Sequence, residues 1–130
     1  AGYFTICEME KTNACEKDGA AADRLIEGLQ AIINKCGLPF VAFNQGAICH
    51  LETSAAMLLD IDIKRFWKIK NTISEAHKRK AAMESFGAAY TKEGVITLAG
   101  SRLYTSAEDT DEIINDALLR FERVFSRINV

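Results

Sequence analysis

The sequence lacks three features that would assign it quickly to a class: a long apolar run, an excess of basic charge and a closely spaced pair of cysteines. Its apolar runs, such as residues 55–59, are far shorter than the roughly 20 residues that a membrane-spanning helix needs. The N-terminal segment also lacks the basic-then-apolar layout of a signal peptide. We therefore expect a cytoplasmic protein with no membrane partner.

The charges of the chain are nearly balanced. Sixteen Lys and Arg residues against eighteen Asp and Glu residues give a formal net charge of -2. Domains that bind nucleic acid usually carry a basic patch or a clear excess of positive charge. The composition therefore argues against a nucleic-acid partner and against an anionic membrane surface.

The four cysteines, Cys7, Cys15, Cys36 and Cys49, are scattered along the chain. Structural zinc sites typically use closely spaced cysteine pairs, so we expect free or buried thiols and no metal site. His50 follows Cys49, but neighbouring residues of a strand point to opposite faces of the sheet. A structural role is therefore favoured over a Cys–His catalytic pair, and we assign no catalytic residue.

The length and composition indicate one ordinary globular domain spanning residues 1–130. The chain is 48% hydrophobic and 26% charged, as is typical of folded domains, and at this length it buries roughly two-thirds of its unfolded surface. It begins at Ala1 and Gly2 rather than at a methionine. We therefore expect it to be a fragment of a longer protein.

Helical periodicity predicts two helices in the first part of the chain. Residues 3–11 are expected to end a helix that Asn13 interrupts. Residues 18–36 carry apolar side chains at the three-and-four spacing of one helix face. Gly37 and Pro39 follow this segment and are typical of a helix end.

Two further helices are expected in the second part. Residues 75–92 form the first of them, and Gly94 ends it. The last helix, which Ser106 begins, is the most strongly amphipathic. Its apolar positions are Ile113, Ile114, Ala117, Leu118, Phe121, Val124, Phe125 and Ile128.

Two pairs of short strands alternate with these helices. The first pair runs over residues 40–51 with a turn at 44–46, and the second runs over 95–104 with a turn at 99–101. Strands that come in hairpins favour antiparallel pairing. We therefore predict an α+β fold, a small and mostly antiparallel sheet built from two hairpins with the helices packed on one face.

Residues 94–109 combine glycines, hydroxyls, an arginine and carboxylates, as a binding site might. Hydroxyls and backbone amides beside a glycine can hold an anion, but a turn followed by a capped helix needs the same residues. We expect Ser106 to cap the last helix, with Asp109 reaching back to it in a capping box. This structural role needs no ligand.

Arg102 is the residue of this segment that turn and capping chemistry do not explain. An arginine in a short apolar strand can hold a substrate carboxylate through a bidentate pair, so Arg102 is the candidate substrate-binding residue. The alternative, which the sequence favours, is that Arg102 faces solvent or pairs with a carboxylate such as that of Glu108.

The chain resembles a known family over nearly its whole length. The stretches RLIEGLQAIINKCGLPFVAFNQGAICHLE and AAYTKEGVITLAGSRLYTSAEDTDEIINDALLRF are similar to the C-terminal part of the class III pyridoxal-phosphate-dependent aminotransferases, particularly the glutamate-1-semialdehyde aminotransferases (aminomutases). The resemblance rests on four features in order. They are Leu25-x-x-Gly28-Leu29, the hairpin end at residues 46–51, Gly94-Val95, and the acidic helix start at residues 106–111.

This resemblance implies the small C-terminal domain of a fold-type I enzyme, which forms one wall of the substrate cleft against a large cofactor-binding domain of the same chain. It implies a homodimeric enzyme that transfers an amino group between an amino acid or amino aldehyde and a keto partner, with pyridoxal 5'-phosphate as cofactor. In the family, the lysine that binds the cofactor covalently lies ahead of this region. No cofactor-binding residue is therefore assigned, and this chain alone is expected to hold no cofactor and to be inactive.

The lysines of the chain support this expectation, because each lies where a helix face or loop would expose it rather than in the dry apolar setting that activates a covalently bound lysine. They are Lys11, Lys17, Lys35, Lys64, Lys68, Lys70, Lys78, Lys80 and Lys92.

The alternative function is a free-standing α+β module that binds a small ligand or regulates a partner. If the chain is instead a domain that packs on a larger partner, it should expose apolar surface when it is alone. Residues 3–9 and 61–67 are the segments expected to do so. The charged residues 77–80 are expected on a solvated helix face.

Overall fold

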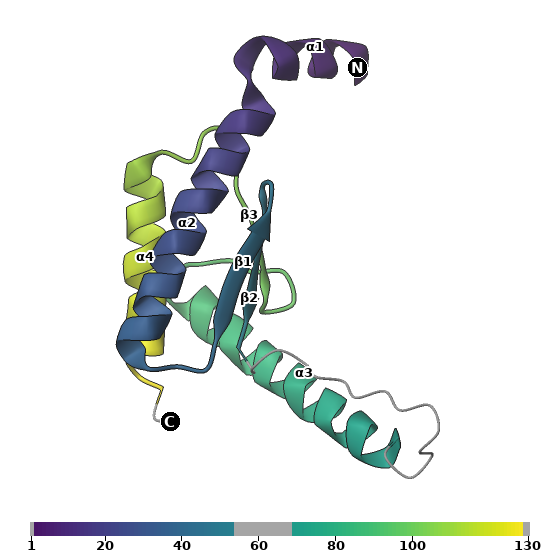
Figure 1. Cartoon of the computed structure of the whole chain (residues 1–130), viewed down its shortest axis with the longest axis vertical. Coiled ribbons are helices and arrows are strands. Elements are labelled where there is room, and N and C mark those ends of the chain that lie inside the picture. The colour runs from purple at the N-terminus through teal and green to yellow at the C-terminus, as the bar shows by residue number, and fades with distance from the viewer. Residues whose placement is uncertain (1, 54–68, 129–130) are drawn as a thin grey trace.

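The chain folds as two helices, a hairpin, a third helix, a short strand and a fourth helix (Figure 1). The computed structural model describes residues 2–53 and 69–128, and within these it describes residues 69–79 by their backbone. This arrangement confirms the predicted α+β class. The bounds are α1 (Gly2–Thr12), α2 (Ala14–Cys36), β1 (Val41–Gln45), β2 (Ile48–Glu52), α3 (Ile69–Lys92), β3 (Arg102–Tyr104) and α4 (Asp111–Phe125).

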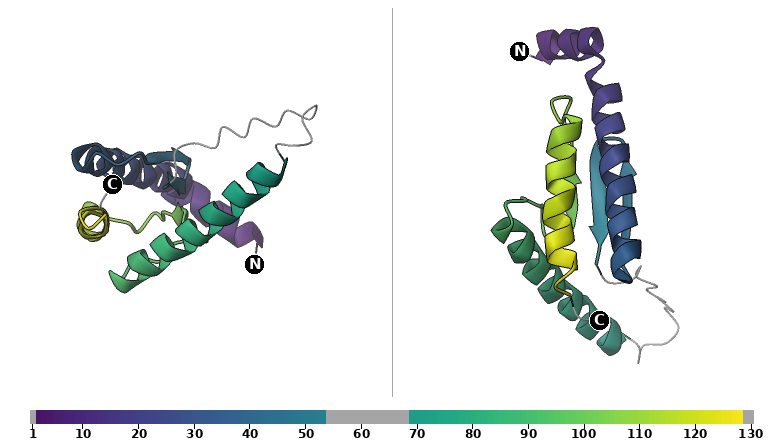
Figure 2. Two further views of the ribbon diagram at one scale, coloured as in Figure 1. Left: turned by 90° about the horizontal axis from the view of Figure 1, so that it is seen from below. Right: turned by 90° about the vertical axis from the view of Figure 1, so that its left-hand side faces the viewer.

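The three strands form an antiparallel sheet in the order β1-β2-β3. Helices α2 and α4 lie side by side on one face of this sheet, as Figure 2 shows. Helix α3 crosses near one end of the sheet, and its C-terminal part contacts α4. The predicted layer of helices on one face is therefore made by α2 and α4.

Asn13 separates the first two helices, as predicted. Its φ of 51° and ψ of 41° lie in the left-handed region, which asparagine adopts more readily than most residues. Helix α1 leaves the axis of α2 sharply at this point (Figure 1). Helix α2 begins directly afterwards at Ala14, ahead of the expected residue 18, because this one residue is enough to make the break.

Glycines end α2 and α3 where the sequence predicts. Gly37 and Gly94 have positive φ values of 65° and 85°. After α2, the Leu38 amide donates to the Ile33 carbonyl at 3.1 Å, and after α3 the Val95 amide donates to the Tyr90 carbonyl at 2.9 Å. Both bonds span five residues, as in the Schellman motif.

The first hairpin turns one residue later than the sequence indicates. Gln45 pairs with Ile48, so the loop consists of Gly46 and Ala47, and Asn44 belongs to β1. Gly46 has a φ of 58°, which suits the tight two-residue turns that join antiparallel strands. The sequence therefore located the hairpin and misplaced the centre of its turn.

The second hairpin is reduced to one bridge between Leu98 and Arg102. Residues 95–97, which we expected in a strand, have no strand structure. The reason lies in the end of α3, because the Val95 amide already donates to Tyr90 and cannot join a ladder.

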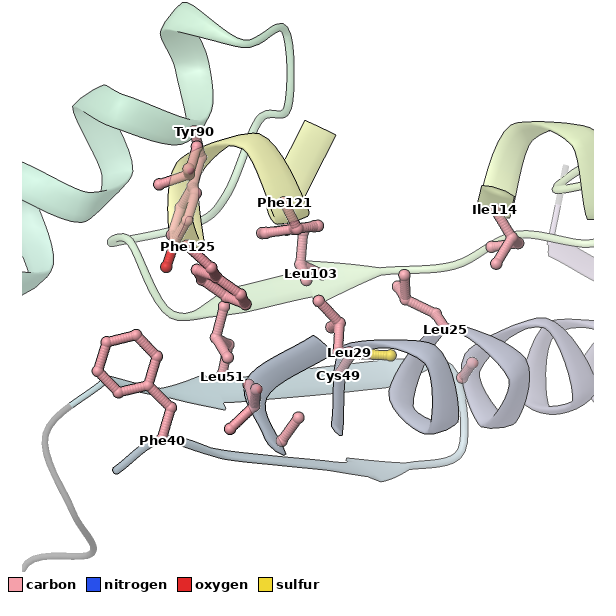
Figure 3. Packing of buried hydrophobic residues seen from close by; sticks show 14 of the residues in the cluster. Leu25, Leu29, Phe40, Cys49, Leu51, Tyr90, Leu103, Ile114, Phe121 and Phe125 are labelled. Carbon is pink, nitrogen blue, oxygen red and sulfur yellow. The ribbon is translucent and has the colours of Figure 1, made fainter. Parts of the chain in front are cut away.

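Apolar side chains from both layers meet between the sheet and the two helices (Figure 3). Aromatic rings of α3 and α4 extend this core beyond the sheet, with Tyr90 and Phe121 at a centroid distance of 5.0 Å and Phe40 and Phe125 at 5.6 Å. Burial of apolar surface in a core of this kind is the main favourable contribution to the stability of a small domain. Its largest fully buried members are Tyr90, Phe121, Phe125, Leu29, Ile33, Leu51 and Cys49.

Gly28 of α2 lies against the Leu118 side chain of α4. A β-carbon at this position would collide with the end of the Leu118 side chain. The Leu25-x-x-Gly28-Leu29 pattern therefore has a packing explanation, since the two leucines are buried and the glycine makes room for a leucine of the facing helix.

Helix α4 begins at Asp111 rather than near Ser106. Thr110 is its N-cap and accepts a hydrogen bond from the Ile113 amide at 3.4 Å. Ser106 and Asp109 instead close a separate turn, in which the Ser106 amide donates to the Asp109 carboxylate at 2.7 Å. The expected contact from Asp109 back to Ser106 thus exists, but it forms ahead of the helix. The Asp109 amide donates to the Ser106 carbonyl rather than to its hydroxyl, and the prediction that Ser106 caps α4 was wrong.

Candidate functional site

The face of the sheet that points away from α2 and α4 carries large side chains. Side chains alternate across a strand, and in the three strands the inward set of Ala42, Cys49, Leu51 and Leu103 is buried. The outward set includes four exposed apolar side chains. We call this surface the open face, and its members are Val41, Phe43, Gln45, Ile48, His50, Glu52, Arg102 and Tyr104.

Cross-strand pairing arranges the open face in rows. Phe43 pairs with His50 and His50 with Arg102, so one row spans all three strands. The rings of Phe43 and His50 are stacked, with centroids 4.9 Å apart and an interplanar angle of 5°. Ile48 and Tyr104 form the next row.

Arg102 lies at the β3 end of the first row with an exposed side chain. Among the described residues, no ion pair or side-chain hydrogen bond involves its guanidinium, and it does not pair with Glu108. This guanidinium has no partner and lies beside an imidazole and apolar side chains. It can bind a carboxylate by donating two parallel hydrogen bonds to it. The structure therefore presents the sequence-predicted residue in a position to bind an anion.

Cys49 and His50 point to opposite faces, as predicted. His50 belongs to the open face, whereas Cys49 is fully buried and its thiol is surrounded by the core. Burial, with a smaller contribution from the charge of Asp23, raises the pKa of Cys49 to about 11. A thiol of this kind stays protonated at neutral pH and is a poor nucleophile.

Two hydroxyls of residues 94–109 are hydrogen-bonded within the fold, whereas the buried Thr97 hydroxyl has no hydrogen-bond partner among the described residues. The Thr105 hydroxyl donates to the Asp18 carbonyl at 2.9 Å, and the Thr105 amide donates to Ala47. The Ser106 hydroxyl accepts from the Glu108 amide at 3.3 Å. Thr105 thus ties the end of β3 to α2 and to the hairpin loop, and these groups do not form an anion cradle.

The described lysines do not fit a covalent pyridoxal-phosphate site. Lys11, Lys17, Lys80 and Lys92 are exposed. Lys35 is also exposed and pairs with Glu122 at 2.6 Å. The hydrogen bond to Glu122, followed by its charge, raises the pKa of Lys35 above its ordinary value, which is the opposite of what an amine nucleophile needs. Lys64 and Lys68 lie outside the described residues, as do the side chains of Lys70 and Lys78.

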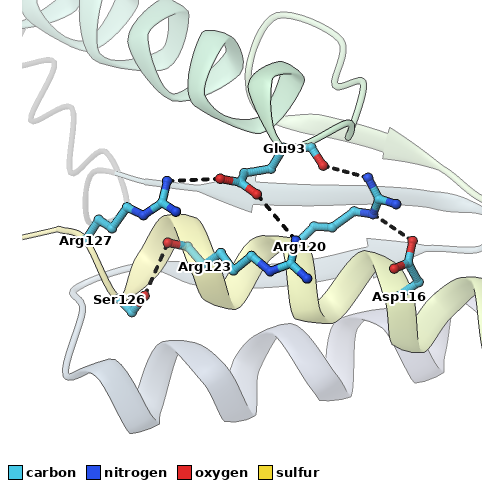
Figure 4. A network of polar contacts seen from close by, with 6 residues as sticks. All are labelled: Glu93, Asp116, Arg120, Arg123, Ser126 and Arg127. Carbon is cyan, nitrogen blue, oxygen red and sulfur yellow. Dashed lines mark hydrogen bonds and ion pairs between the residues drawn. The ribbon is translucent and has the colours of Figure 1, made fainter.

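A carboxylate near the end of α3 joins that helix to α4 (Figure 4). Glu93, whose side chain is 15% exposed, pairs with Arg127 at 2.9 Å and with Arg123 at 3.6 Å. Arg120 donates to the Glu93 carbonyl at 2.7 Å and pairs with Asp116 at 2.6 Å. This cluster was not predicted, although the spacing of arginines at 120, 123 and 127 in the sequence could have indicated it.

Two hollows lie beside this cluster. One of about 360 Å³ is lined by α3 and the end of α4, including Phe86 and Val124. The other, of about 410 Å³, includes Tyr104, Asp116 and Arg120. The arginines at both hollows already hold carboxylates, whereas the exposed Lys92 at the first hollow has no ion-pair partner among the described residues.

The described residues contain neither a cluster suited to a metal ion nor a helix that could span a membrane. Within residues 2–53 and 69–128, no cluster of three or more His, Cys, Asp or Glu side chains is suited to hold a metal ion. None of the described helices is both long and apolar enough to cross a bilayer.

The apolar segment at residues 3–9 is exposed as predicted. No residue of α1 is buried, and the Tyr3 and Phe4 side chains are 74% and 77% exposed. The other expected segment, residues 61–67, lies outside the described residues. The same holds for the side chains of residues 77–79, whereas Lys80 is exposed and lies 3.9 Å from Glu84.

Comparison with known proteins adds no assignment, since no protein-family model and no curated protein matches the chain.

Proposed function

We propose that this chain is the small C-terminal domain of a class III pyridoxal-phosphate-dependent aminotransferase or aminomutase of the glutamate-1-semialdehyde type. The support is the resemblance of the sequence, together with one structural observation. The order of α2, hairpin, α3, β3 and capped α4 follows the order of the four features on which the resemblance rests. The proposal places the enzyme in the cytoplasm as a homodimer.

In this proposal the domain binds and orients the substrate and does not hold the cofactor. The described lysines are exposed or ion-paired, so the cofactor and the lysine that binds it belong to a large domain ahead of this region. When bound there, pyridoxal phosphate supplies the electron sink for amino-group transfer. The open face would form one wall of the substrate cleft.

Arg102 is the residue of this wall that we propose to contact the substrate. Its guanidinium has no carboxylate partner among the described residues and lies beside His50. The substrates implied by the resemblance are amino acids or amino aldehydes, and many of these carry a carboxylate. A bidentate contact would hold this group and so orient the amino end toward the cofactor.

The test uses the protein encoded by the complete reading frame that contains this chain. We expect it to transfer amino groups when supplied with pyridoxal phosphate. In the Arg102→Ala variant, KM for a carboxylate-bearing substrate should rise roughly tenfold or more, because a charged hydrogen bond is typically worth about 1.5–3 kcal/mol. Arg102→Lys should recover little, since the two-pronged contact is lost.

The control is Arg24→Ala, which removes an arginine that pairs with Asp111 at 2.7 Å across α2 and α4. Its KM should match the wild type. Unchanged KM in Arg102→Ala would remove the substrate role of Arg102 and leave the family assignment standing. A reading frame without a lysine-bearing large domain, or a complete protein with no amino-group transfer, would instead favour the free-standing binding module.

A further inference from the structure

We propose that the 130-residue chain, by itself, forms a two-fold symmetric dimer in which α1 of each copy lies on the open face of the other. This inference concerns the chain by itself and does not rest on the enzymatic role, in which the same open face would line the substrate cleft instead. It follows from two apolar surfaces of one molecule that lack a partner, from an unpaired charge of opposite sign on each and from the place where α1 is attached.

Helix α1 is the first of the two surfaces. It has no buried residue, and its exposed apolar side chains include Tyr3, Phe4 and Ile6. An isolated helix shorter than about 12–15 residues is marginal in water, and α1 has 11 residues. Its stability therefore calls for a surface on which these side chains can pack.

The open face is the second surface. It exposes Val41, Phe43, Ile48 and Tyr104 on a sheet whose opposite side is covered by α2 and α4. An apolar sheet face is normally buried against another layer, and a helix is a usual occupant. Contiguous apolar surface of this kind typically marks an interaction site.

The helix of the same copy does not cover this face. Asn13 is the single residue between α1 and α2, so no linker allows α1 to fold back along the strands. In Figure 1, α1 lies across the far end of α2 and beyond the sheet. Its contacts are chiefly with α2. The α1 of a second copy is free of this restriction.

One pair of opposite charges can meet between the two surfaces. Helix α1 carries Glu8 and Glu10, and Lys11 lies 3.7 Å from Glu8 in an exposed pair. The open face carries Arg102 with His50 beside it, and it also carries the carboxylate of Glu52. Neither Glu10 nor Arg102 has an ion-pair partner among the described residues. A carboxylate from α1 can therefore meet the guanidinium of the other copy while the apolar side chains around both are covered.

Two-fold symmetry forms this contact twice and closes the assembly. Each copy offers the aromatic side chains of Tyr3, Phe4, Phe43 and Tyr104. Since an aromatic side chain buries on the order of 150–250 Å², eight of them bring the interface toward the roughly 1,200–2,000 Å² of stable complexes.

The first experiment measures the mass of the chain by sedimentation equilibrium over a range of concentrations. The monomer mass is 14.4 kDa, and we expect twice this value. Phe4→Ala should raise the dissociation constant roughly tenfold or more, because it removes a central aromatic contact. Leu119→Ala is the matched control, since Leu119 is an exposed apolar residue of α4 at 54%. It should leave the dissociation constant within about twofold of the wild type.

The second experiment tests which surfaces meet. Glu10→Arg and Arg102→Glu each place like charges at both contacts of their homodimers, so each variant alone should be largely monomeric. When the two variants are mixed, both contacts of the heterodimer join opposite charges again. The mixture should therefore dimerise, and high salt should weaken it. All of the substituted residues are exposed, so melting temperatures of the monomeric variants should agree within a few degrees.

A wild-type chain that remains monomeric throughout would overturn the proposal. So would a dimer that Phe4→Ala leaves intact, or a mixture of the two charge variants that stays monomeric. None of these outcomes concerns amino-group transfer, which is measured on the complete protein. The dimer and the enzymatic role can therefore fail separately.

Discussion

At the scale of single residues, the side of a strand to which a residue points decides its chemistry. Cys49 and His50 are adjacent in β2, yet one is buried in the core and the other stacks on Phe43 at the surface. The strict alternation of strands made this separation predictable. The missing partner of Arg102 was not predictable, because a sequence does not show which carboxylates a side chain can reach.

The buried thiol of Cys49 should make stability fall at alkaline pH. Its pKa is raised from the ordinary 9.0 to about 11 in the folded chain. Between these two values the unfolded thiol ionises while the folded thiol keeps its proton, so the unfolded state becomes relatively more favourable. The free energy of unfolding should fall by up to about 1.4 kcal/mol per pH unit in this window and level off above it.

Urea unfolding at several pH values, compared with a Cys49→Ala variant, measures this effect. The variant should lose the Cys49 contribution to the slope. Burial also raises the pKa of Tyr90, and this contribution is common to both proteins and cancels in the difference. Identical slopes above pH 9.0 would show that Cys49 does not titrate as described.

At the scale of elements, the sequence located helix ends better than helix starts. Gly37 and Gly94 were identified because a left-handed residue after a helix favours glycine. The start of α4 was misplaced, because Ser106 and Thr110 are both good capping residues. The choice depends on how far the chain must run from β3 before it can pack on α2, and local sequence does not contain that distance.

Substitution of the two candidate caps should separate them. Thr110→Ala should lower the free energy of unfolding by about 1 kcal/mol, since it removes the acceptor for the Ile113 amide at the start of α4. Ser106→Ala is the matched control and should cost less, because its hydroxyl accepts a hydrogen bond in a turn outside the helix and does not satisfy an amide of the first turn of α4. Thermal unfolding of both variants tests this, and equal losses would contradict the assignment of Thr110 as the cap.

At the scale of the whole molecule, the sequence predicted the layers but not which sheet face the helices cover. In β1 and β2 the outward side chains Val41, Phe43 and Ile48 are at least as apolar as the inward Ala42 and Cys49. The alternation of side chains therefore identifies two faces of the sheet but does not show which of them the helices bury. The position of α3 could not be predicted from the sequence either, because it depends on close contact between segments distant along the chain.

Gly100 fixes α3 against the turn that leads into β3. Its φ is 73°, and a β-carbon at this position would collide with the Met83 carbonyl oxygen. Gly100→Ala combines a strained backbone with a clash against helix backbone, each worth about 1–3 kcal/mol. We therefore expect a loss of about 2 kcal/mol or more in the free energy of unfolding.

Gly46→Ala provides the control for backbone strain alone. Gly46 has a comparable φ of 58°, but nothing lies within 4 Å of the added carbon. This variant should lose about 1 kcal/mol. Urea unfolding of both variants measures the difference. If Gly100→Ala lowers the free energy of unfolding no more than Gly46→Ala does, α3 is not in close steric contact with the turn.

Helix α1 is joined to α2 through the single residue Asn13, so a small rotation there moves the whole helix. The direction of α1 depends on the two backbone dihedral angles of this one residue. A helix of 11 residues is roughly 16 Å long, so a rotation of about 30° at the pivot carries its far end through about 8 Å. Tyr3 and Phe4 lie at that far end, where the displacement is greatest. A single-residue change in backbone angle can therefore reposition the most exposed aromatic side chains among the described residues without disturbing any residue of the core.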